Sequence, residues 1–354
     1  MALRLGRIVQ ARARAQSWSI AQRFSRQHGT ISGGQPKYAV TCPGQGSSGE
    51  GLLAPFKKFQ HHFQQSLQAV DEQLQENFGK QLVDPGAHED WMGRTSNSQP
   101  AILTTTYVMH EILRKEYGID LSQHPAVNYM LGHSLGQYTA MALTGVVDLA
   151  SAVSLVRQRG LLMERIAESS DYDLVAVLFR SSAYDEVLRA CQEANVLANI
   201  NSYDQLVLSG TRAHIDETIR AINSPKRKIL KKVSLAQKIP FHNEVLRPIE
   251  EELASFAPEP RAGSKPIIAN LTGSVETSDI LSSSIQSISR PVRWIESVEY
   301  ALQHDTTSFI NLGPGTVLQN INTKFTPNNV SISDPDSMDE FARTFSSSTD
   351  SACN

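Results

Sequence analysis

Apolar residues along the chain alternate between short continuous runs and longer stretches with helical period, and this pattern predicts an α/β fold. Short apolar runs at 38–41 and 126–132 are typical of buried strands. Helical period over about 52–78, 98–117 and 149–169 predicts helices that alternate with them. A strand that runs into a glycine-rich turn and then a helix indicates a parallel sheet covered by helices.

The pattern changes between about 171 and 237, where four short strands and two helices follow one another in the order βαββαβ. This order predicts a small ferredoxin-like subdomain at 171–237, inserted into a parallel-sheet domain made of 37–170 and 238–345. Two more core strands are expected in "KPIIANLTG" and "TTSFINLGPG". The chain beyond Thr326 is polar with one weak helix, "SMDEFARTF", and 346–354 is expected to be a flexible tail.

The composition is ordinary for a globular protein, with 40% hydrophobic and 19% charged residues in a chain of 354. No apolar run approaches the roughly 18 to 20 residues that span a bilayer, so a membrane protein is not expected. The three cysteines, Cys42, Cys191 and Cys353, form no C-x-x-C pair. Such sparse use of cysteine favours a reducing compartment without a disulfide or zinc framework.

Residues 1–30 differ from the rest because they contain six arginines and no lysine, and because Glu50 is the first acidic residue of the chain. Serine, alanine and short apolar steps separate the arginines, a composition typical of a mitochondrial transit peptide. The alternative is a disordered basic arm that binds nucleic acid. Removing six positive charges takes the net charge from −3 to −9, and such an acidic protein is not expected to have nucleic acid as its main partner. The sequence therefore predicts a protein of the mitochondrial matrix.

A candidate nucleophile, Ser134, stands in "GHSLG" after a predicted strand and before a helix. A serine hydroxyl is a weak nucleophile at neutral pH, so it needs a base and a site for the oxyanion. Gly132 and Gly136 allow the sharp turn that exposes the serine, and the following helix directs N–H groups at developing negative charge. The pentapeptide alone also fits a glycine-rich turn with a passive serine.

His242, on a predicted loop in "IPFHNEVL", is the candidate base, since loops often hold catalytic groups. His133 lies beside the serine, but adjacent side chains on such a turn point apart, so we interpret it as structural. Arg159 falls within the apolar face of its helix, where a charge is unfavourable unless it is paired. It forms either a structural ion pair with a distant carboxylate or a fork for a carboxylated ligand.

A second glycine pattern, "GQGSSG" at 44–49, satisfies the dinucleotide spacing G-x-G-x-x-G. The acid that such a site needs about 20 residues further on should end a second strand. Here that distance falls at Asp71 and Glu72, inside a helical stretch. We therefore expect no dinucleotide cofactor.

Taken together, the motifs resemble those of the malonyl-CoA:acyl-carrier-protein transacylases of the mitochondrial, type II system of fatty-acid synthesis. The resemblance covers roughly 38–345 and implies a hydrolase-like α/β parallel-sheet domain with an inserted ferredoxin-like subdomain. Seven motifs appear in the order of the family: "PGQGSS", "SQPAIL", "GHSLGQYTA", "RQRGLLME", "PFHN", "RPVRWIESVEY" and "NLGPGTVL". Such a set is far more specific than the serine pentapeptide.

The resemblance implies a role for each candidate residue. Ser134 would be the nucleophile and His242 its base. The backbone amides of Gln45 and Leu135 would bind the oxyanion, and Arg159 would hold the malonyl carboxylate.

Two positions near these residues need comment. In the family a main-chain carbonyl orients the base, and that position corresponds here to Ser287. Gln137 stands where the family usually has glutamate, and the sequence assigns no consequence to this difference.

The implied activity is ping-pong transfer of a malonyl group from malonyl-CoA to the pantetheine thiol of an acyl carrier protein, through a malonyl-serine that supplies fatty-acid synthesis. No metal or redox cofactor is implied. We expect a monomer whose partners are malonyl-CoA and the carrier, with no nucleic acid and no membrane.

Two alternatives stay open on the residues alone. A serine thioesterase or esterase of the α/β-hydrolase type has the order Ser, Asp or Glu, then His near the C-terminus, whereas about a third of this chain follows His242. A carrier-binding scaffold without activity is disfavoured by the intact serine, histidine and arginine.

The densest basic stretch, 224–238, places Lys228 and Lys232 on one face of the last predicted strand of the small unit. Lysines in this pattern either dock an acidic partner such as a carrier protein or protect an edge strand against aggregation. The sequence does not separate these two interpretations.

Overall fold

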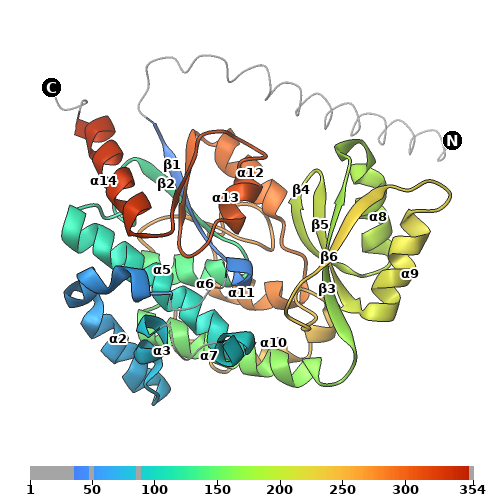
Figure 1. Cartoon of the computed structure of the whole chain (residues 1–354), viewed down its shortest axis with the longest axis horizontal. Helices are drawn as coiled ribbons and strands as arrows, with labels where there is room; N and C mark the ends of the chain where they lie inside the picture. The colour runs from blue at the N-terminus through green and yellow to red at the C-terminus, as the bar shows by residue number, and fades with distance from the viewer. Residues whose placement is uncertain (1–35, 48–51, 85–88, 351–354) are drawn as a thin grey trace. The chain divides into compact units, whose positions relative to one another are not determined.

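The computed structural model describes residues 36–47, 52–84 and 89–350 (Figure 1). The predicted transit peptide at 1–30 lies outside these residues. In the described part of the chain, no helix is both long enough and apolar enough to cross a membrane. Two sheets organise the described residues.

The larger sheet has five parallel strands in the order β7-β2-β1-β8-β9. Side chains alternate between its faces, because Val40 and Met130 enter one apolar cluster while Ala39 and Leu131 enter another. Strands buried on both faces give continuous apolar runs, which is why the sequence reveals them. The strands are β1 (Tyr38–Cys42), β2 (Val127–Gly132), β7 (Ile267–Ile268), β8 (Ser308–Leu312) and β9 (Asn329–Ile332).

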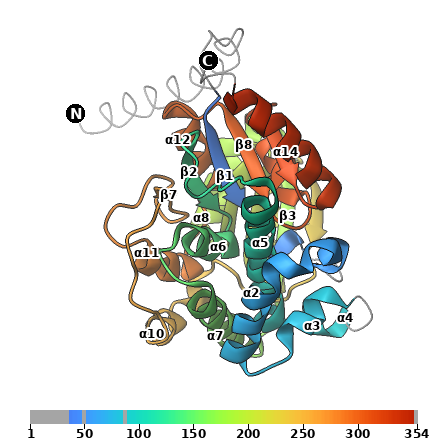
Figure 2. The same ribbon diagram turned by 90° about the vertical axis from the view of Figure 1, so that its left-hand side faces the viewer.

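Helices cover both faces of this sheet (Figure 2). One face carries α5 (Thr95–Tyr117), α6 (Leu135–Thr144) and α7 (Leu149–Ala167), against which α2 (Gln60–Leu74) packs. The opposite face carries α12 (Trp294–Gln303) and α13 (Val317–Asn322). Shorter helices complete this part of the chain: α3 (Phe78–Val83), α4 (Glu89–Gly93), α10 (Ile249–Ala254) and α11 (Ile280–Gln286).

The smaller sheet has four antiparallel strands in the order β4-β5-β3-β6. Helix α8 (Tyr184–Glu193) follows β3, helix α9 (Arg212–Ile222) follows β5, and both pack against the sheet in a separate apolar cluster. Strand β6 lies at an edge, and five of its six residues are exposed. The strands are β3 (Tyr172–Phe179), β4 (Leu197–Ser202), β5 (Gln205–Thr211) and β6 (Ile229–Ser234).

A backbone bridge joins the smaller sheet to the rest of the structure. The Ile200 N–H donates to Val292 O and the Val292 N–H donates to Ala198 O, both at 2.9 Å. Val292 lies just before α12 and is fully buried in the cluster on one face of the larger sheet. The bridge therefore holds β4 beside α12.

The helix predicted at 52–78 is interrupted in the structure. A 3₁₀ turn at Ala54–Phe59 precedes α2, and α3 begins only at Phe78. Gln75 adopts the left-handed conformation (φ 55°) that ends α2, and nothing in the periodicity of the sequence marks this residue.

The C-terminal part of the chain is more ordered than its polar composition predicts. It contributes β9 to the larger sheet and then forms α14 (Pro335–Asp350), whose side chains Met338, Phe341 and Phe345 are buried. Residues 346–350 are therefore helical rather than part of a flexible tail, and 351–354 lie outside the described residues.

Candidate active site

Ser134 lies in a sharp turn between β2 and α6. Its backbone has φ 53° and ψ −106°, a conformation that residues with a side chain rarely adopt. A Cβ at Gly132 would lie 1.8 Å from the carbonyl carbon of Gly136, and a Cβ at Gly136 would lie 2.1 Å from the carbonyl oxygen of Cys42. These neighbours are backbone atoms, so only glycine fits on either side of the serine.

A distant side chain holds this turn. The Asn270 side chain accepts a hydrogen bond from the Ser134 N–H (2.7 Å) and donates one to Gly132 O (2.6 Å). Asn270 follows the short strand β7, which is paired with β2, so its amide reaches both ends of the turn. Two backbone groups beside the serine are thereby satisfied without any charge.

Gln137 supports Asn270 from within α6. Its Oε1 accepts a hydrogen bond from the Asn270 N–H (2.6 Å), and its Nε2 donates to the Ser284 hydroxyl. A glutamine supplies both the acceptor and the donor that these partners require, whereas the carboxylate of a glutamate could only accept. The structure thus gives the residue a local role that the sequence did not reveal.

His242 faces the serine from the other side. Its Nε2 lies 2.7 Å from Ser134 Oγ, while Nδ1 lies 2.8 Å from Ser287 O and 3.1 Å from Arg290 O. Carbonyl oxygens only accept hydrogen bonds, so Nδ1 carries the proton and Nε2 can accept from the Ser134 hydroxyl. In the part of the chain that the structure describes, the hydrogen-bond partners of this ring are a hydroxyl and two carbonyls, with no carboxylate.

The surroundings of His242 keep its ring neutral. Burial, followed by the positive charge of Arg159, lowers the pKa of His242 to about 3 from the ordinary value of 6.5. A neutral imidazole with an unprotonated Nε2 is the form that can take a proton from a hydroxyl.

Arg159 on α7 is almost completely buried, with 1% of its surface exposed. Its Nη1 donates to Gln99 Oε1 (2.6 Å) and its Nη2 to Ser134 Oγ (3.2 Å), while Nε has no partner. Within the described residues no carboxylate forms an ion pair with it, so the structural ion pair considered from the sequence is not present there. A buried cation with an unused donor beside the serine can bind a carboxylate.

Gln45 and Leu135 lie at the two loops that border the serine. Gln45 begins a 3₁₀ turn after β1, and its side chain donates to Ser98 Oγ (2.9 Å) and to Thr95 Oγ1. Leu135 is the first residue of α6, where N–H groups have no acceptor within the helix. The Leu135 N–H therefore lies next to Ser134 without an acceptor in its own helix, and Gln45 lines the same pocket as Ser134.

A hollow of about 330 Å³ opens beside Ser134 and His242. It lies between the two sheets, because its walls come from loops of the larger sheet, from α13, from three strands of the smaller sheet and from the segment that leads to His242. Among the lining residues are Gln45, His133, Leu174, Ala176, Asn199, Val207, Leu235, Ala236, Gln237 and Phe241.

His133 also borders the hollow, but its contacts are structural. Its Nε2 lies 2.9 Å from Asn201 Oδ1, and its ring packs against Trp294 at 5.3 Å between centroids. Burial lowers the pKa of His133. The ring links β4 to α12 rather than serving Ser134.

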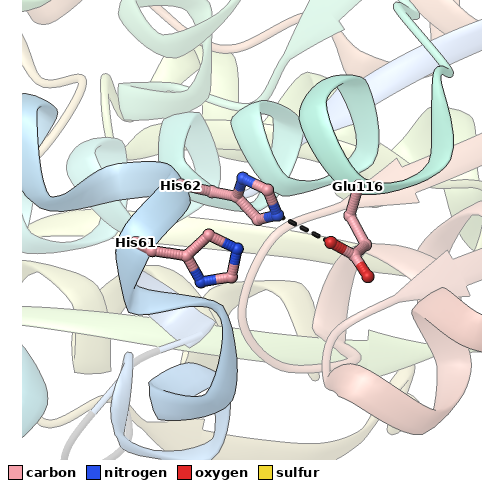
Figure 3. Close-up of side chains that lie close together, drawn as sticks. All are labelled: His61, His62 and Glu116. Carbon is pink, nitrogen blue, oxygen red and sulfur yellow. Dashed lines mark hydrogen bonds and ion pairs between the residues drawn. The ribbon is translucent and has the colours of Figure 1, made fainter.

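One group of metal-ligand side chains lies apart from this hollow (Figure 3). His61 and His62 of α2 and Glu116 of α5 have ligand atoms within 4.8 Å of one another. His62 Nε2 already contacts Glu116 Oε2 at 2.7 Å. Such a group could hold a metal ion, but none of its members lines the hollow. The expectation that the reaction uses no metal stays a prediction.

Two lysines of the basic stretch are paired with acidic side chains of the smaller sheet's helices. Lys228 pairs with Glu186 of α8 (2.7 Å) and Lys232 with Asp216 of α9 (2.8 Å). Because β6 is an exposed edge strand and the charges of Lys228 and Lys232 are compensated locally, these two lysines fit edge protection better than carrier docking.

Gln99 and Asn270 are two site residues that the sequence interpretation missed. Asn270 ends an apolar run at the carboxyl edge of a parallel sheet, and a polar residue in that place is a signal that could have found it. Gln99 lies in the motif "SQPAIL", which marked the segment but gave this residue no role of its own.

Comparison with known proteins agrees with a site built around a nucleophilic serine. Residues 40–338 match the family described as acyl transferase domain. The malonyl CoA-acyl carrier protein transacylase of Bacillus subtilis is 30% identical over 328 residues, which cover 89% of this chain and 99% of that protein.

Solved structures of related enzymes have the same fold. An acyl-carrier-protein S-malonyltransferase from Burkholderia pseudomallei superposes with a TM-score of 0.76 at 28% identity and covers 87% of this chain and 99% of its own. A malonyl-transacylase in complex with its type II PKS acyl-carrier protein superposes with a TM-score of 0.78 over 87% of this chain and 99% of its own. At 24% identity, the second likeness shows the fold alone.

Proposed function

This chain belongs to the malonyl CoA-acyl carrier protein transacylase family of acyltransferases, and we propose that it transfers a malonyl group from malonyl-CoA to the pantetheine thiol of an acyl carrier protein. One observation carries the proposal: Ser134 Oγ lies between the neutral His242 Nε2 (2.7 Å) and the buried Arg159 (3.2 Å). The relatives are transacylases, so the thioesterase or esterase alternative receives no support from them.

In the first step Ser134 Oγ attacks the thioester carbonyl of malonyl-CoA while His242 Nε2 takes the serine proton. The N–H groups of Gln45 and Leu135 bind the oxyanion, aided by the N-terminus of α6. Arg159 binds the malonyl carboxylate through its unused Nε and through Nη2. The carbon–sulfur bond then breaks, coenzyme A leaves as a thiol with the proton from His242, and a malonyl ester stays on Ser134.

The second step reverses the first with a new thiol. The pantetheine thiol of the carrier gives its proton to His242 and attacks the ester carbonyl. The carbon–oxygen bond breaks, Ser134 recovers its proton from His242, and the malonyl thioester leaves on the carrier. The neutral ring is regenerated in each step, so one base serves both.

The finer parts of the proposal rest on other observations. The element order βαββαβ and the strand order β4-β5-β3-β6 support a ferredoxin-like subdomain inserted at 171–237 of a hydrolase-like domain. The arginine-rich composition of residues 1–30 supports a mitochondrial matrix protein. There it would act as a monomer that supplies malonyl groups to fatty-acid synthesis, with neither nucleic acid nor a membrane as its partner.

Mixing the purified protein with labelled malonyl-CoA tests the function. We expect a labelled adduct at Ser134, located by peptide mass spectrometry, that passes its label to acyl carrier protein faster than to water. The Ser134→Ala protein should form no adduct. Rapid release of free malonate would support a hydrolase instead, and label on the Ser134→Ala protein would show that the nucleophile is another residue.

A further inference from the structure

Asp173 is an acidic side chain buried at the beginning of β3, next to Leu174, which lines the hollow. Only 5% of its side chain is exposed. A carboxylate in such a place is unfavourable unless charges and hydrogen bonds compensate it. The compensation comes from three separate parts of the chain.

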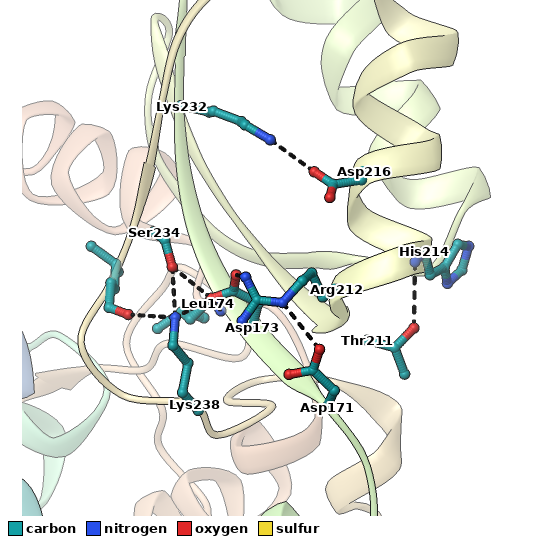
Figure 4. A network of polar contacts seen from close by, with 11 residues as sticks. Asp171, Asp173, Leu174, Thr211, Arg212, His214, Asp216, Lys232, Ser234 and Lys238 are labelled. Atoms are coloured by element: carbon teal, nitrogen blue, oxygen red, sulfur yellow. Dashed lines mark hydrogen bonds and ion pairs between the residues drawn. The ribbon is translucent and has the colours of Figure 1, made fainter.

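Figure 4 shows Asp173 between Ser234 and Lys238 on one side and Arg212 on the other. Oδ1 accepts hydrogen bonds from Lys238 Nζ and Ser234 Oγ, each at 2.8 Å, and from the Leu174 N–H at 2.9 Å. Oδ2 lies 3.3 Å from Nη1 of Arg212, the first residue of α9. Burial opposes ionisation, but the hydrogen bonds from Lys238 and Ser234 hold the pKa of Asp173 below its ordinary value, so the carboxylate is charged at neutral pH.

Ser234 ends β6 and precedes the segment 235–241, which connects β6 to His242 and which we term the wall segment; Lys238 lies within this segment. Four of its residues line the hollow: Leu235, Ala236, Gln237 and Phe241. The Leu235 N–H donates a hydrogen bond to Leu174 O (2.8 Å). The segment itself forms neither strand nor helix. Side-chain contacts therefore have to hold most of it in place.

We propose that Asp173 is a positioning residue whose carboxylate fastens the wall segment to β3 through Ser234 and Lys238 and so fixes the width of the acyl pocket. His242 has its own anchors in the carbonyls of Ser287 and Arg290, so loss of Asp173 loosens the wall more than the base. The fastening is independent of the reaction, and only its kinetic consequence rests on the proposed function.

Hydrogen exchange of the full chain, followed by mass spectrometry, tests the fastening directly. Asp173→Asn keeps the size of the side chain and removes its charge. We expect the amides within 235–241 to exchange about tenfold faster, the factor that corresponds to about 1.4 kcal/mol, which is just under the lower end of the range of about 1.5 to 3 kcal/mol for a hydrogen bond to a charged group.

Asp216→Asn is the matched control, because it breaks the exposed pair with Lys232 on the same sheet without touching the wall segment (Figure 4). Unchanged exchange at 235–241 in Asp173→Asn, or an equal increase in both variants, would overturn the proposal.

A second variant, Lys238→Met, removes one partner of Asp173 instead of the buried carboxylate. Because Lys238 is half-exposed, this change is expected to leave the fold intact even if Asp173→Asn does not fold. It should accelerate the same segment to a smaller extent. Its effect should be smaller than in the wild type when it is made in the Asp173→Asn background, where only the bonds of Lys238 to Ser234 Oγ (2.7 Å) and Leu235 O (3.3 Å) are left to lose. Additive effects would contradict the proposed contact.

The kinetic consequence separates positioning from simple stability. If the wild-type protein forms the malonyl-Ser134 adduct, Asp173→Asn should raise the KM for malonyl-CoA several-fold, leave kcat nearly unchanged, and accept a branched acyl-CoA better relative to malonyl-CoA. A destabilised but correctly shaped pocket would lower kcat without changing that ratio, and this result would contradict the proposal. If the wild-type protein forms no adduct, the proposed function fails, whereas the exchange experiment still decides the role of Asp173.

Discussion

The larger and the smaller sheet hold their sides of the hollow by different means. On the larger sheet the Ser134 turn depends on uncharged contacts, namely the close packing of Gly132 and Gly136 and the hydrogen bonds of Asn270. On the smaller sheet the wall segment depends on Asp173 and its cationic partners. Buried neutral contacts respond little to salt, whereas partly exposed ion pairs are screened by it. The position of the reacting atoms and the position of the pocket wall should therefore be separable by mutation.

The largest loss of activity is expected when the base, His242, is removed. His242→Ala should lower the rate of acylation by labelled malonyl-CoA by at least about a hundredfold, because general-base catalysis contributes at least that much. His61→Ala, at an exposed position of α2, is the control and should keep the wild-type rate. A His242→Ala protein that retains a tenth of the rate would contradict the assignment of the base.

Arg159→Ala should change the selectivity between malonyl and acetyl groups more than the overall ability to transfer acyl groups. We expect malonyl transfer to fall by about ten- to a hundredfold, since hydrogen bonds to charged groups contribute about 1.5 to 3 kcal/mol, while acetyl transfer is retained or rises. Both rates can be measured with the two labelled acyl-CoA donors. Arg165→Ala on the same helix, whose partner Glu252 is exposed, serves as the control. Equal loss of both activities would indicate a structural arginine.

Asn270→Ala tests the uncharged hydrogen bonds that hold the Ser134 turn on the larger sheet. It leaves the Ser134 N–H and Gly132 O without their partner, so we expect kcat to fall about tenfold and the free energy of unfolding to fall by about 1 to 3 kcal/mol. KM for malonyl-CoA should change little, in contrast to Asp173→Asn. Asn328→Ala, at an exposed position after α13, should alter neither quantity. A change confined to KM would show that the turn and the wall are not separable.

Acidic pH should affect stability before it affects the base. Because the pKa of His242 is lowered to about 3, kcat/KM for acylation should stay level down to about pH 5 instead of falling near 6.5. The unfolded chain binds the proton at its ordinary pKa, so the contribution of His242 to stability is complete above pH 6.5 and is lost as pH falls below it, by about 1.4 kcal/mol per pH unit. Urea unfolding should show that the free energy of unfolding falls less steeply with falling pH in His242→Gln than in the wild type, because His133, whose pKa is also lowered by burial, is present in both proteins. An inflection of kcat/KM near 6.5 would mean that the ring is not buried as described.

The smallest effect is expected from charge reversal at the edge of the smaller sheet. Lys228 and Lys232 are already paired with acids and so offer little uncompensated charge to a carrier, and changing both to glutamate should raise the KM for carrier protein less than about twofold. Titration of the carrier at low and high salt measures this. A larger rise that disappears in salt would show that the stretch docks the carrier after all.

The sequence predicts those features of this molecule that depend on neighbouring residues. The turn around Ser134 requires glycine two positions before and two positions after it, and that requirement is visible in five letters. The apolar runs of β1, β2 and β8 likewise reveal a parallel sheet, because they are buried on both faces.

Features that depend on distant partners could not be predicted in the same way. The Asn270 and Gln99 side chains reach the site from β7 and α5, and only the folded chain brings them to Ser134 and Arg159. Strand β9 is short and only partly buried, so its few apolar residues do not stand out in a polar stretch. The end of α2 depends on the backbone conformation of Gln75, which leaves no mark on the hydrophobic pattern.

The charge of Arg159 acts on His242 as well as on the ligand it would bind. Its positive field is the second cause, after burial, of the low pKa of His242. A malonyl carboxylate on Arg159 would cancel that field, so the ring would become a stronger base only when the correct acyl group is in place. An acetyl group brings no charge and leaves the base weak. Discrimination between acyl groups would thus be exerted twice, once in affinity and once in the basicity of the catalyst.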